Sequence, residues 1–143
     1  MIPPVAYRLP VRVYWEDTDA GGVVYHANYL RFLERARTEW LRALGVDQDA
    51  ERQRSGRVFV VHHVDAHYLK PARLDDLLEV RVGVSEARSA SVVFGQSIWR
   101  GDIELLRARI RVACVDTEHF RPQRLDPDLL QRLHAPTHTA TRP

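Results

Sequence analysis

The chain reads YWEDTDAGGVVYHANY from Tyr14 to Tyr29, and this stretch joins two elements of different periodicity. Leading into it, residues 7–15 carry β-branched and aromatic side chains in partial alternation, which predicts a strand. Its middle holds acidic residues, a threonine and the pair Gly21 and Gly22, which predict a turn because glycine reaches left-handed backbone conformations at low cost. A helical repeat follows. The stretch therefore indicates a strand, a glycine turn and a helix in direct succession.

A single long helix is expected after the turn. Apolar side chains recur there at spacings of four, three, four and four residues, which puts them on one helix face. They are Tyr29, Leu33, Ala36, Trp40 and Leu44. The N-cap is Asn28 or a residue nearer His26, and Gly45 is suited to ending the helix. We expect the helix to run from about Ala27 to Leu44.

Four strands are expected after the helix. Residues 78–85 and 106–114 alternate apolar with polar side chains, which is typical of antiparallel strands with one buried face. Residues 58–68 are rich in residues that favour strands, and residues 92–98 carry apolar side chains on one face. Short connections between these runs indicate hairpins. The order strand, turn, helix and strands predicts an α+β fold in which one sheet buries one helix.

Composition narrows the class of protein. The 143 residues are 45% hydrophobic and 28% charged, which suits a folded domain and excludes a disordered chain. A net charge of +2 gives no sign of a nucleic-acid partner. Cys114 is the only cysteine, and we expect neither a disulfide, a signal peptide nor a membrane span. We expect a cytoplasmic protein with one domain over residues 1–126 and a mobile tail over residues 127–143, which includes one short helical turn.

The acidic residues of the turn have two interpretations. A helix N-terminus presents free backbone N–H groups that can bind a developing oxyanion. A carboxylate aimed at the same acyl carbon can attack it, or can activate a water that attacks it. The turn and the helix start thus supply the parts of a minimal acyl-transfer site. In the alternative interpretation, the acidic residues only cap the turn and the helix.

A family resemblance favours the first interpretation. Residues 16–29, continuing into residues 34–39, resemble the signature of hotdog-fold acyl-CoA thioesterases of the 4-hydroxybenzoyl-CoA thioesterase superfamily, and more narrowly of its Tol-Pal-associated subfamily. Residues 68–76 and 112–116 fit the same subfamily, and the resemblance covers residues 7–122. It implies a hotdog fold, with a five-stranded antiparallel sheet wrapped around one long helix. It also implies a homodimer or homotetramer with active sites between subunits.

The resemblance further implies which residues act on the substrate. Asp19, the second aspartate of the Asp-Thr-Asp element, is the implied catalytic carboxylate, as a nucleophile or as a general base. The backbone N–H of His26 is implied to polarise the thioester carbonyl, and its side chain is implicated as well. The expected substrate-binding residues are Trp15, Gly22, Val23, Tyr25, Asn28, Val60, Val61, His62 and Arg88. Trp15 stands where close relatives often carry a tyrosine, and a packed core aromatic is the alternative for it.

The expected reaction is hydrolysis of an acyl-CoA thioester to a free acid and coenzyme A. No cofactor or metal is expected, because coenzyme A is part of the substrate. A Gly-x-Ser-x-Gly nucleophile motif is missing from the sequence, which agrees with a carboxylate mechanism. The alternatives are a binding or scaffolding module for acyl thioesters, a hydroxyacyl-thioester dehydratase, and a hydrolase whose partner is an acyl carrier protein.

Other polar residues receive structural interpretations. Asp17 is expected to serve the turn, and Glu34 to be an ordinary helix residue outside the catalytic set. The histidines within residues 62–67 lack the ligand spacing of a zinc site. The arginines at alternate positions of residues 107–111 predict a basic ridge on a solvated sheet face or at a subunit contact, with phosphate binding as the alternative.

Overall fold

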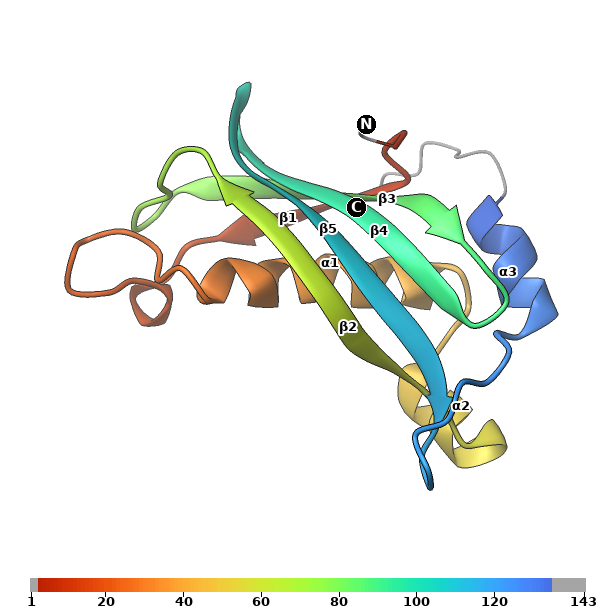
Figure 1. Cartoon of the computed structure of the whole chain (residues 1–143). Coiled ribbons are helices and arrows are strands. Elements are labelled where there is room, and N and C mark those ends of the chain that lie inside the picture. Colours follow the sequence, from red (N-terminus) through yellow and green to blue (C-terminus); the bar gives the residue numbers. More distant parts are fainter. Residues whose placement is uncertain (1–2, 135–143) are drawn as a thin grey trace.

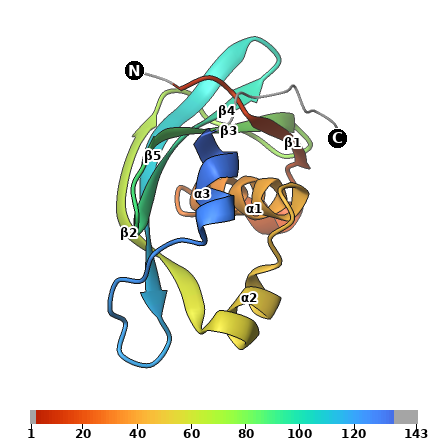
Figure 2. The ribbon, with the colours of Figure 1, turned by 90° about the vertical axis from the view of Figure 1, so that its right-hand side faces the viewer.

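The chain folds into one curved antiparallel sheet with a long helix against its inner face (Figures 1 and 2). The computed structural model describes residues 3–134. The strand order is β1-β3-β4-β5-β2, and all neighbours are antiparallel. The strands are β1 Tyr7–Arg12, β2 Arg57–Tyr68, β3 Leu77–Ala87, β4 Ser91–Arg100 and β5 Ile103–Asp116. The helices are η1 Trp15–Asp17, α1 Asn28–Ala43, α2 Gln48–Ser55 and α3 Pro127–His134. The expected α+β fold, with five antiparallel strands around one long helix, is confirmed.

Helix α1 lies against the sheet because one of its faces is apolar. Phe32 and Leu33 are fully buried, and the Trp40 ring packs edge-on against Phe94 of β4. The helix ends as expected, since Gly45 continues the chain with φ of 94°. Of the two expected starts, the structure has the one nearer His26: the N-cap residue is Ala27, which has no capping side chain. Asn28 is instead the first helical residue, and its side chain bonds elsewhere.

The first strand is shorter than expected. It ends at Arg12 rather than at Trp15, because residues 15–17 form the single 3-10 turn η1. The backbone N–H of Asp17 donates to the Tyr14 carbonyl, and that of Thr18 donates to the Trp15 carbonyl. The glycine turn is thus preceded by a second, tighter turn that the alternating side chains did not indicate.

Strand β2 forms an open edge of the sheet. Its inner face carries Val61, Val64 and Tyr68, of which Val61 is 51% exposed. A β-bulge at His62 interrupts its pairing with β5. On the outer face, the three arginines of residues 107–111 pair in register with His67, Asp65 and His63. The basic ridge therefore lies on the outer face of the sheet, where Arg107 and Arg109 are exposed to solvent.

Helix α2 was not expected, because it has no apolar face. It is defined by its ends instead: the Asp47 carboxylate accepts hydrogen bonds from the backbone N–H groups of Asp49 and Ala50, at 3.1 and 3.2 Å. Gly56 ends the helix with φ of 74°. All of its residues are exposed or half-buried. Local capping rather than burial therefore specifies this helix.

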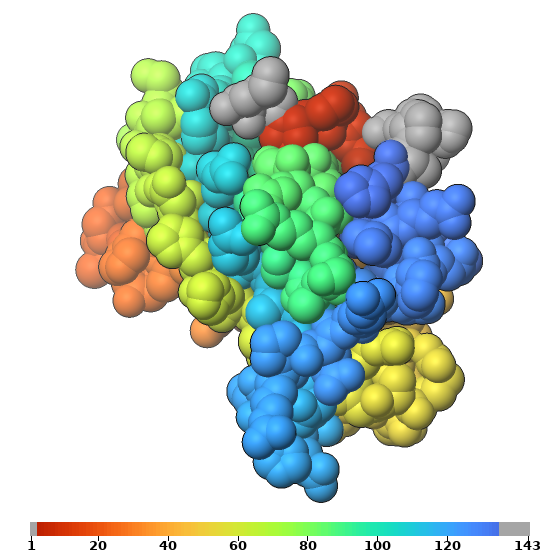
Figure 3. Space-filling model, turned by 45° about the vertical axis from the view of Figure 1, so that its right-hand side comes forward, coloured from red at the N-terminus to blue at the C-terminus, as the bar shows by residue number. Residues whose placement is uncertain are grey.

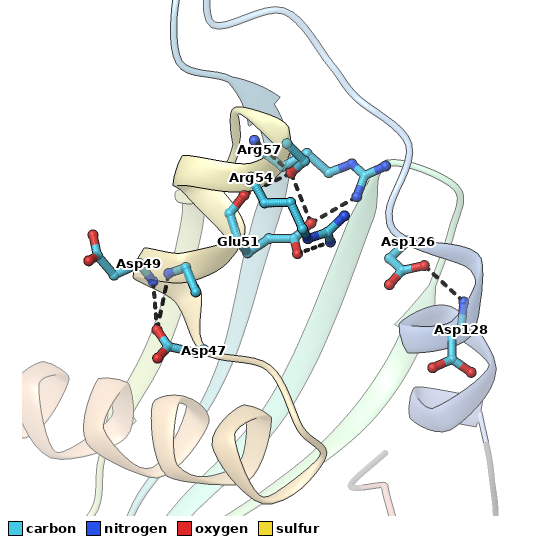
Figure 4. A network of polar contacts seen from close by, with 9 residues as sticks. Asp47, Asp49, Glu51, Arg54, Arg57, Asp126 and Asp128 are labelled. Carbon is cyan, nitrogen blue, oxygen red and sulfur yellow. Dashed lines mark hydrogen bonds and ion pairs between the residues drawn. The ribbon is translucent and has the colours of Figure 1, made fainter.

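Glu51 of α2 is the centre of a polar network that ties the helix to β2 (Figure 4). Its carboxylate accepts from Arg57 at 2.8 Å and from Ser55 at 2.9 Å, and it pairs with Arg54. Burial raises the pKa of Glu51, but the hydrogen bonds from Ser55, Arg54 and Arg57 outweigh burial and hold that pKa below its usual value. The network therefore favours the ionised carboxylate.

Helix α3 is longer than the single expected turn, and its Leu129 and Leu133 join the core cluster of the sheet and α1. It begins behind Asp126, whose carboxylate accepts from the backbone N–H of Asp128 at 3.3 Å (Figure 4). Arg132 donates to the Leu44 carbonyl at the end of α1. Helix α3 thus shares one core with the sheet and α1. Residues 135–143 of the expected tail lie outside the described residues.

The N-terminal residues cross the outer face of the sheet at two glycines. Gly83 of β3 and Gly95 of β4 lie opposite each other in register. A Cβ atom on Gly83 would lie 2.2 Å from the Pro4 carbonyl oxygen, and one on Gly95 would lie 2.4 Å from Cδ of Pro3. Figure 3 shows this N-terminal segment, in red, against the green of β3. Only glycine leaves room for the segment at these positions.

Candidate active site

The turn that holds Asp19 closes on itself through backbone hydrogen bonds. The Asp19 N–H donates to the Val23 carbonyl at 2.9 Å, and the Gly22 N–H donates to the Asp19 carbonyl at 3.0 Å. Gly22 has φ of 82°, so the turn uses the left-handed conformation that the paired glycines predicted. Oδ1 of Asp19 accepts the Gly21 N–H at 2.8 Å. Oδ2 has no hydrogen-bond partner among the described residues, and the side chain is exposed.

Asp17 fastens this turn to the start of α1. It is 4% exposed, and its Oδ1 accepts the side-chain amide N–H of Asn28 at 2.7 Å. Its Oδ2 accepts the Tyr14 N–H at 2.8 Å, and its carbonyl accepts the Tyr25 N–H at 2.9 Å. One buried carboxylate thereby joins the strand end, the turn and the helix. Asp17 has the structural role expected for it, and the Asn28 amide is engaged in the same role.

The start of α1 presents free backbone donors. Within residues 3–134, no hydrogen-bond acceptor faces the backbone N–H groups of His26 and Ala27. The carbonyl of His26 accepts a hydrogen bond from the Tyr68 hydroxyl at 2.7 Å. That carbonyl and the Ala27 N–H belong to the same peptide unit, so Tyr68 fixes the direction in which this N–H points. The site therefore has two free donors at the positive end of the helix dipole, and Tyr68 orients that of Ala27.

Tyr68 is a site residue that sequence reasoning did not select. It lies at the end of β2, and its ring packs edge-on against Tyr29, with 5.4 Å between the ring centroids. Burial first, and then the neighbouring Tyr29, raise the pKa of Tyr68, so its hydroxyl stays protonated as a donor at neutral pH. Tyr68 could have been selected from its position on the inner face of β2, where it pairs in register with buried Leu106.

Asp19 lies at the same end of the molecule as these groups. Burial raises the pKa of Tyr29, and the negative charge of nearby Asp19 raises it further. The Tyr29 hydroxyl accepts the Ala72 N–H at 3.0 Å, which fixes the ring between α1 and the chain that follows β2. The carboxylate, the free N–H groups and the two tyrosines thus meet at the N-terminal end of α1, on the left of Figure 1.

The other residues expected around the turn form an exposed rim. Trp15 is 79% exposed, so the alternative of a packed core aromatic is wrong. Tyr25 is exposed, and its ring lies 4.6 Å from the His26 ring, centroid to centroid. Val23 contributes its carbonyl to the turn and Gly22 its left-handed backbone. The side chains of Trp15 and Tyr25 thus leave this part of the molecule open to solvent.

The remaining expected residues lie away from Asp19 in this chain. Val61 faces inward on β2, Val60 lies on the opposite face, and His62 is the exposed bulge residue. Arg88 lies in the connection between β3 and β4, which Figure 1 places beside α3 at the far end of α1. Arg88 pairs there with Glu86. The structure does not bring these residues together with Asp19 in one subunit.

An open pocket lies between the C-terminal half of α1 and the sheet. The space between its lining residues is about 520 Å³, and this volume includes solvent outside the pocket mouth. Apolar side chains of β2, β4, β5 and α3 line it, and Val61 is the one expected substrate-binding residue among them. Its polar lining comes from α1 and from the start of α2. The pocket and the free N–H groups therefore lie at opposite ends of α1.

Residues 3–134 contain neither a candidate metal site nor a candidate membrane-spanning helix. No three His, Cys, Asp or Glu side chains gather there in a way that could hold a metal ion. None of the helices in this range is long and apolar enough to cross a membrane.

Comparisons with known proteins agree on one family. The thioesterase-like superfamily model matches residues 13–133. The acyl-CoA thioesterase YbgC of Haemophilus influenzae is 48% identical over 116 residues, which cover 81% of this chain and 85% of that protein. The acyl-CoA thioester hydrolase YbgC of Escherichia coli O6:H1 is 49% identical over 121 residues, 83% of this chain and 89% of that protein. A crystal structure of a probable thioesterase from Bartonella henselae matches with a TM-score of 0.78 at 36% identity, covering 83% of this chain and 98% of that one.

Proposed function

The chain belongs to the thioesterase-like superfamily, and from this membership we propose how it carries out acyl-CoA hydrolysis. The hotdog fold that the resemblance implied is confirmed. The protein is an acyl-CoA thioesterase, which converts an acyl-CoA thioester and water to a free acid and coenzyme A. The Tol-Pal association expected from the sequence stays a prediction.

The proposed chemistry uses Asp19 and the start of α1. The thioester carbonyl oxygen accepts hydrogen bonds from the free N–H groups of His26 and Ala27, which stabilise the negative charge that develops on it. Because the Gly21 N–H holds Oδ1 of Asp19, Oδ2 is the reacting oxygen. No cofactor or metal takes part. The observation that carries this proposal is the pair of backbone N–H groups without an acceptor, that of Ala27 oriented by Tyr68, at the end of α1 where the turn exposes the Asp19 carboxylate.

Two routes use these same groups. In the first, Oδ2 removes a proton from a water whose oxygen attacks the carbonyl carbon, the C–S bond breaks, and the proton passes to the departing thiolate. In the second, Oδ2 itself bonds to the carbonyl carbon, and the thiolate leaves and takes a proton from water. The hydroxide left from that water then attacks the resulting anhydride, which releases the acid and restores the Asp19 carboxylate. Both routes consume one water overall and release an acid and a thiol.

We propose that the working unit is a homodimer that pairs β2 with β2 of a second copy, and that dimers associate further into tetramers. Strand β2 is an open edge with exposed apolar side chains, which suits such pairing. A two-fold antiparallel pair sets the start of each strand beside the end of the other. Tyr68, next to His26, would then meet the partner near Phe59, which lines the pocket. Each Asp19 would act on an acyl chain held in the partner's pocket.

The location and the thiol are part of the proposal. A cytoplasmic location rests on Cys114, which is buried and free. Coenzyme A is the proposed thiol because the relatives are named for acyl-CoA. Thioesters of an acyl carrier protein are the alternative substrate, and a binding or scaffolding module is the alternative without turnover.

Thiol release from a panel of acyl-CoA and acyl-carrier-protein thioesters tests this mechanism. We expect Asp19→Asn to lower kcat at least about a hundredfold, since the amide can neither attack nor take a proton. The matched control is Glu16→Gln, which removes an exposed carboxylate three residues away. Wild-type activity confined to carrier-protein substrates would identify the alternative thiol. Full activity in Asp19→Asn, or no turnover by the wild type, would contradict the mechanism.

A further inference from the structure

We propose that the pocket beside α1 binds a carboxylate at the far end of the acyl chain, through the guanidinium of Arg37. The inference rests on the proposed function, because it takes this pocket to be the acyl-binding site. It assigns a substrate class: thioesters whose acyl group ends in a second carboxylate are preferred over unsubstituted acyl groups of equal length.

Arg37 is a buried cation without an acidic partner. It lines the pocket and is 8% exposed, so more than nine-tenths of the residue is buried. No carboxylate oxygen of the described residues lies within 4.0 Å of its guanidinium. Its one hydrogen bond runs from Nη1 to Oε1 of Gln96, at 2.9 Å. Burying a charge beside a neutral amide is costly, which singles this residue out.

Arg37, which lines the pocket, has donors that its bond to Gln96 does not use. Nε and Nη2 have no acceptor within residues 3–134. Neither nitrogen is sealed inside the protein, because neither is among the fully buried side-chain atoms of the described residues that lack a hydrogen bond. Burial lowers the pKa of Arg37, and the charge of Glu34 partly opposes this effect. An arginine remains charged under such conditions, so the pocket contains a positive charge with free donors.

Gln96 holds the guanidinium in place. Its Nε2 donates to the Leu33 carbonyl of α1 at 3.0 Å, which turns Oε1 toward Arg37. Gln96 is itself buried, so the pair spans α1 and β4 within the core. A fork of donors fixed in this way is suited to a planar carboxylate, which can accept two parallel hydrogen bonds.

The rest of the pocket fits a hydrocarbon chain. Leu41, Phe59 and Phe94 line it from α1, β2 and β4. An acyl chain with a terminal carboxylate offers apolar surface to these side chains and an anion to Arg37. Glu34 is the acidic group of the lining, and it is exposed rather than buried. Its negative charge weakens the attraction for an anion, so removing that charge sharpens the preference.

Matched pairs of substrates test the proposal. The pairs are butanoyl- and succinyl-CoA, hexanoyl- and adipoyl-CoA, and octanoyl- and suberoyl-CoA. We expect kcat/KM to favour the carboxylated member of at least one pair by about tenfold or more, chiefly through KM. Arg37→Met should abolish this preference, and Glu34→Gln should increase it. The control is Arg35→Met, which removes the same charge from the exposed face of the same helix and should keep the preference.

Binding measurements separate this proposal from the proposed function. Dissociation constants of the same pairs are measured by calorimetry with Asp19→Asn protein, in which turnover is not needed. Tighter binding of the carboxylated thioesters, lost with Arg37→Met, supports the proposal even if the wild type hydrolyses none of them. Equal affinity within every pair, or loss of the preference in Arg35→Met, overturns it while leaving the thioesterase mechanism intact. If Arg37→Met does not fold, Arg37→Lys replaces it, and an unchanged preference there argues against the planar fork.

Discussion

The two ends of helix α1 are built in different ways. At its N-terminal end, one short stretch of the chain carries Asp17, Asp19 and His26, and hydrogen bonds within residues 14–28 close the turn and join it to the start of the helix. At its C-terminal half, the pocket combines side chains from helices and strands far apart in the sequence, and Arg37 and Gln96 are separated by 59 positions. The reactive groups are exposed, whereas the cation of the pocket is buried.

The two regions are therefore stabilised by different kinds of contact. The loop depends on backbone groups and one buried carboxylate, so its geometry follows from a few local hydrogen bonds. The pocket depends on packing of the whole core, so its shape follows from the fold. Chemistry and substrate selection are therefore separable in this protein, and variants at one end of α1 should leave the other end largely unchanged.

The strongest test of the loop is removal of the Asp17 carboxylate. Asp17→Ala leaves the Asn28 amide and the Tyr14 N–H without their buried partner, so we expect a loss of about 3 kcal/mol in the free energy of unfolding and of most activity. Urea denaturation followed by circular dichroism measures the first quantity. Glu16→Ala, on the exposed side of the same turn, should change stability by less than about 0.5 kcal/mol. Equal stability of the two variants would mean that the loop is held in another way.

A smaller effect is expected at the Tyr68 hydroxyl. Tyr68→Phe removes the hydrogen bond to the His26 carbonyl, so the Ala27 N–H loses its fixed direction. We expect kcat to fall about tenfold and stability to fall by about 1 kcal/mol. Tyr7→Phe is the matched control, since no partner of the Tyr7 hydroxyl exists among the described residues. A change confined to KM would assign Tyr68 to substrate binding rather than to orientation of the donor.

The smallest effect on stability is expected at Glu51 of α2, the helix whose Gln48 lines the pocket. Its folded-state pKa is lowered below the usual value near 4.5, so it contributes stability above that pH and loses it as the pH falls through the folded-state pKa. We expect Glu51→Gln to cost less than about 1 kcal/mol at neutral pH and to flatten the decline of the melting temperature below about pH 5. Thermal melts of both proteins over this pH range measure the difference. Parallel curves would show that the network around α2 does not stabilise the fold.

Local patterns in the sequence predicted the parts of the fold that depend on them. The apolar repeat from Tyr29 to Trp40 placed α1, although Phe32 and Leu41 widen the buried face beyond that single stripe. The glycine turn followed from Gly21 and Gly22. Helix α2 was missed because it has no apolar periodicity, yet Asp47 and Gly56 were visible as its start and stop signals.

The pocket could not be predicted in the same way. In the sequence, nothing distinguishes Arg37 from the other arginines of the helix. Its role depends on the packing of β4 against α1, which places Gln96 at its guanidinium. Tyr68 acquires its role only when the end of β2 reaches the start of α1. Whether Trp15 is buried depends on a 3-10 turn that its alternating neighbours did not indicate. Contacts between elements far apart in the sequence decide these roles. The local sequence patterns do not predict such contacts.

The crossing of Pro3 and Pro4 over Gly83 and Gly95 has a practical consequence for handling the protein. The N-terminal segment runs along the outer face of the sheet, whereas α1 and the pocket lie on the inner face. An affinity tag, a fluorescent label or a solid support joined ahead of Pro3 therefore starts from the side opposite the pocket. A tag joined after α3 starts from a helix whose Leu129 and Leu133 line that pocket. For immobilised assays of acyl selection, attachment ahead of Pro3 leaves the inner face of the sheet free.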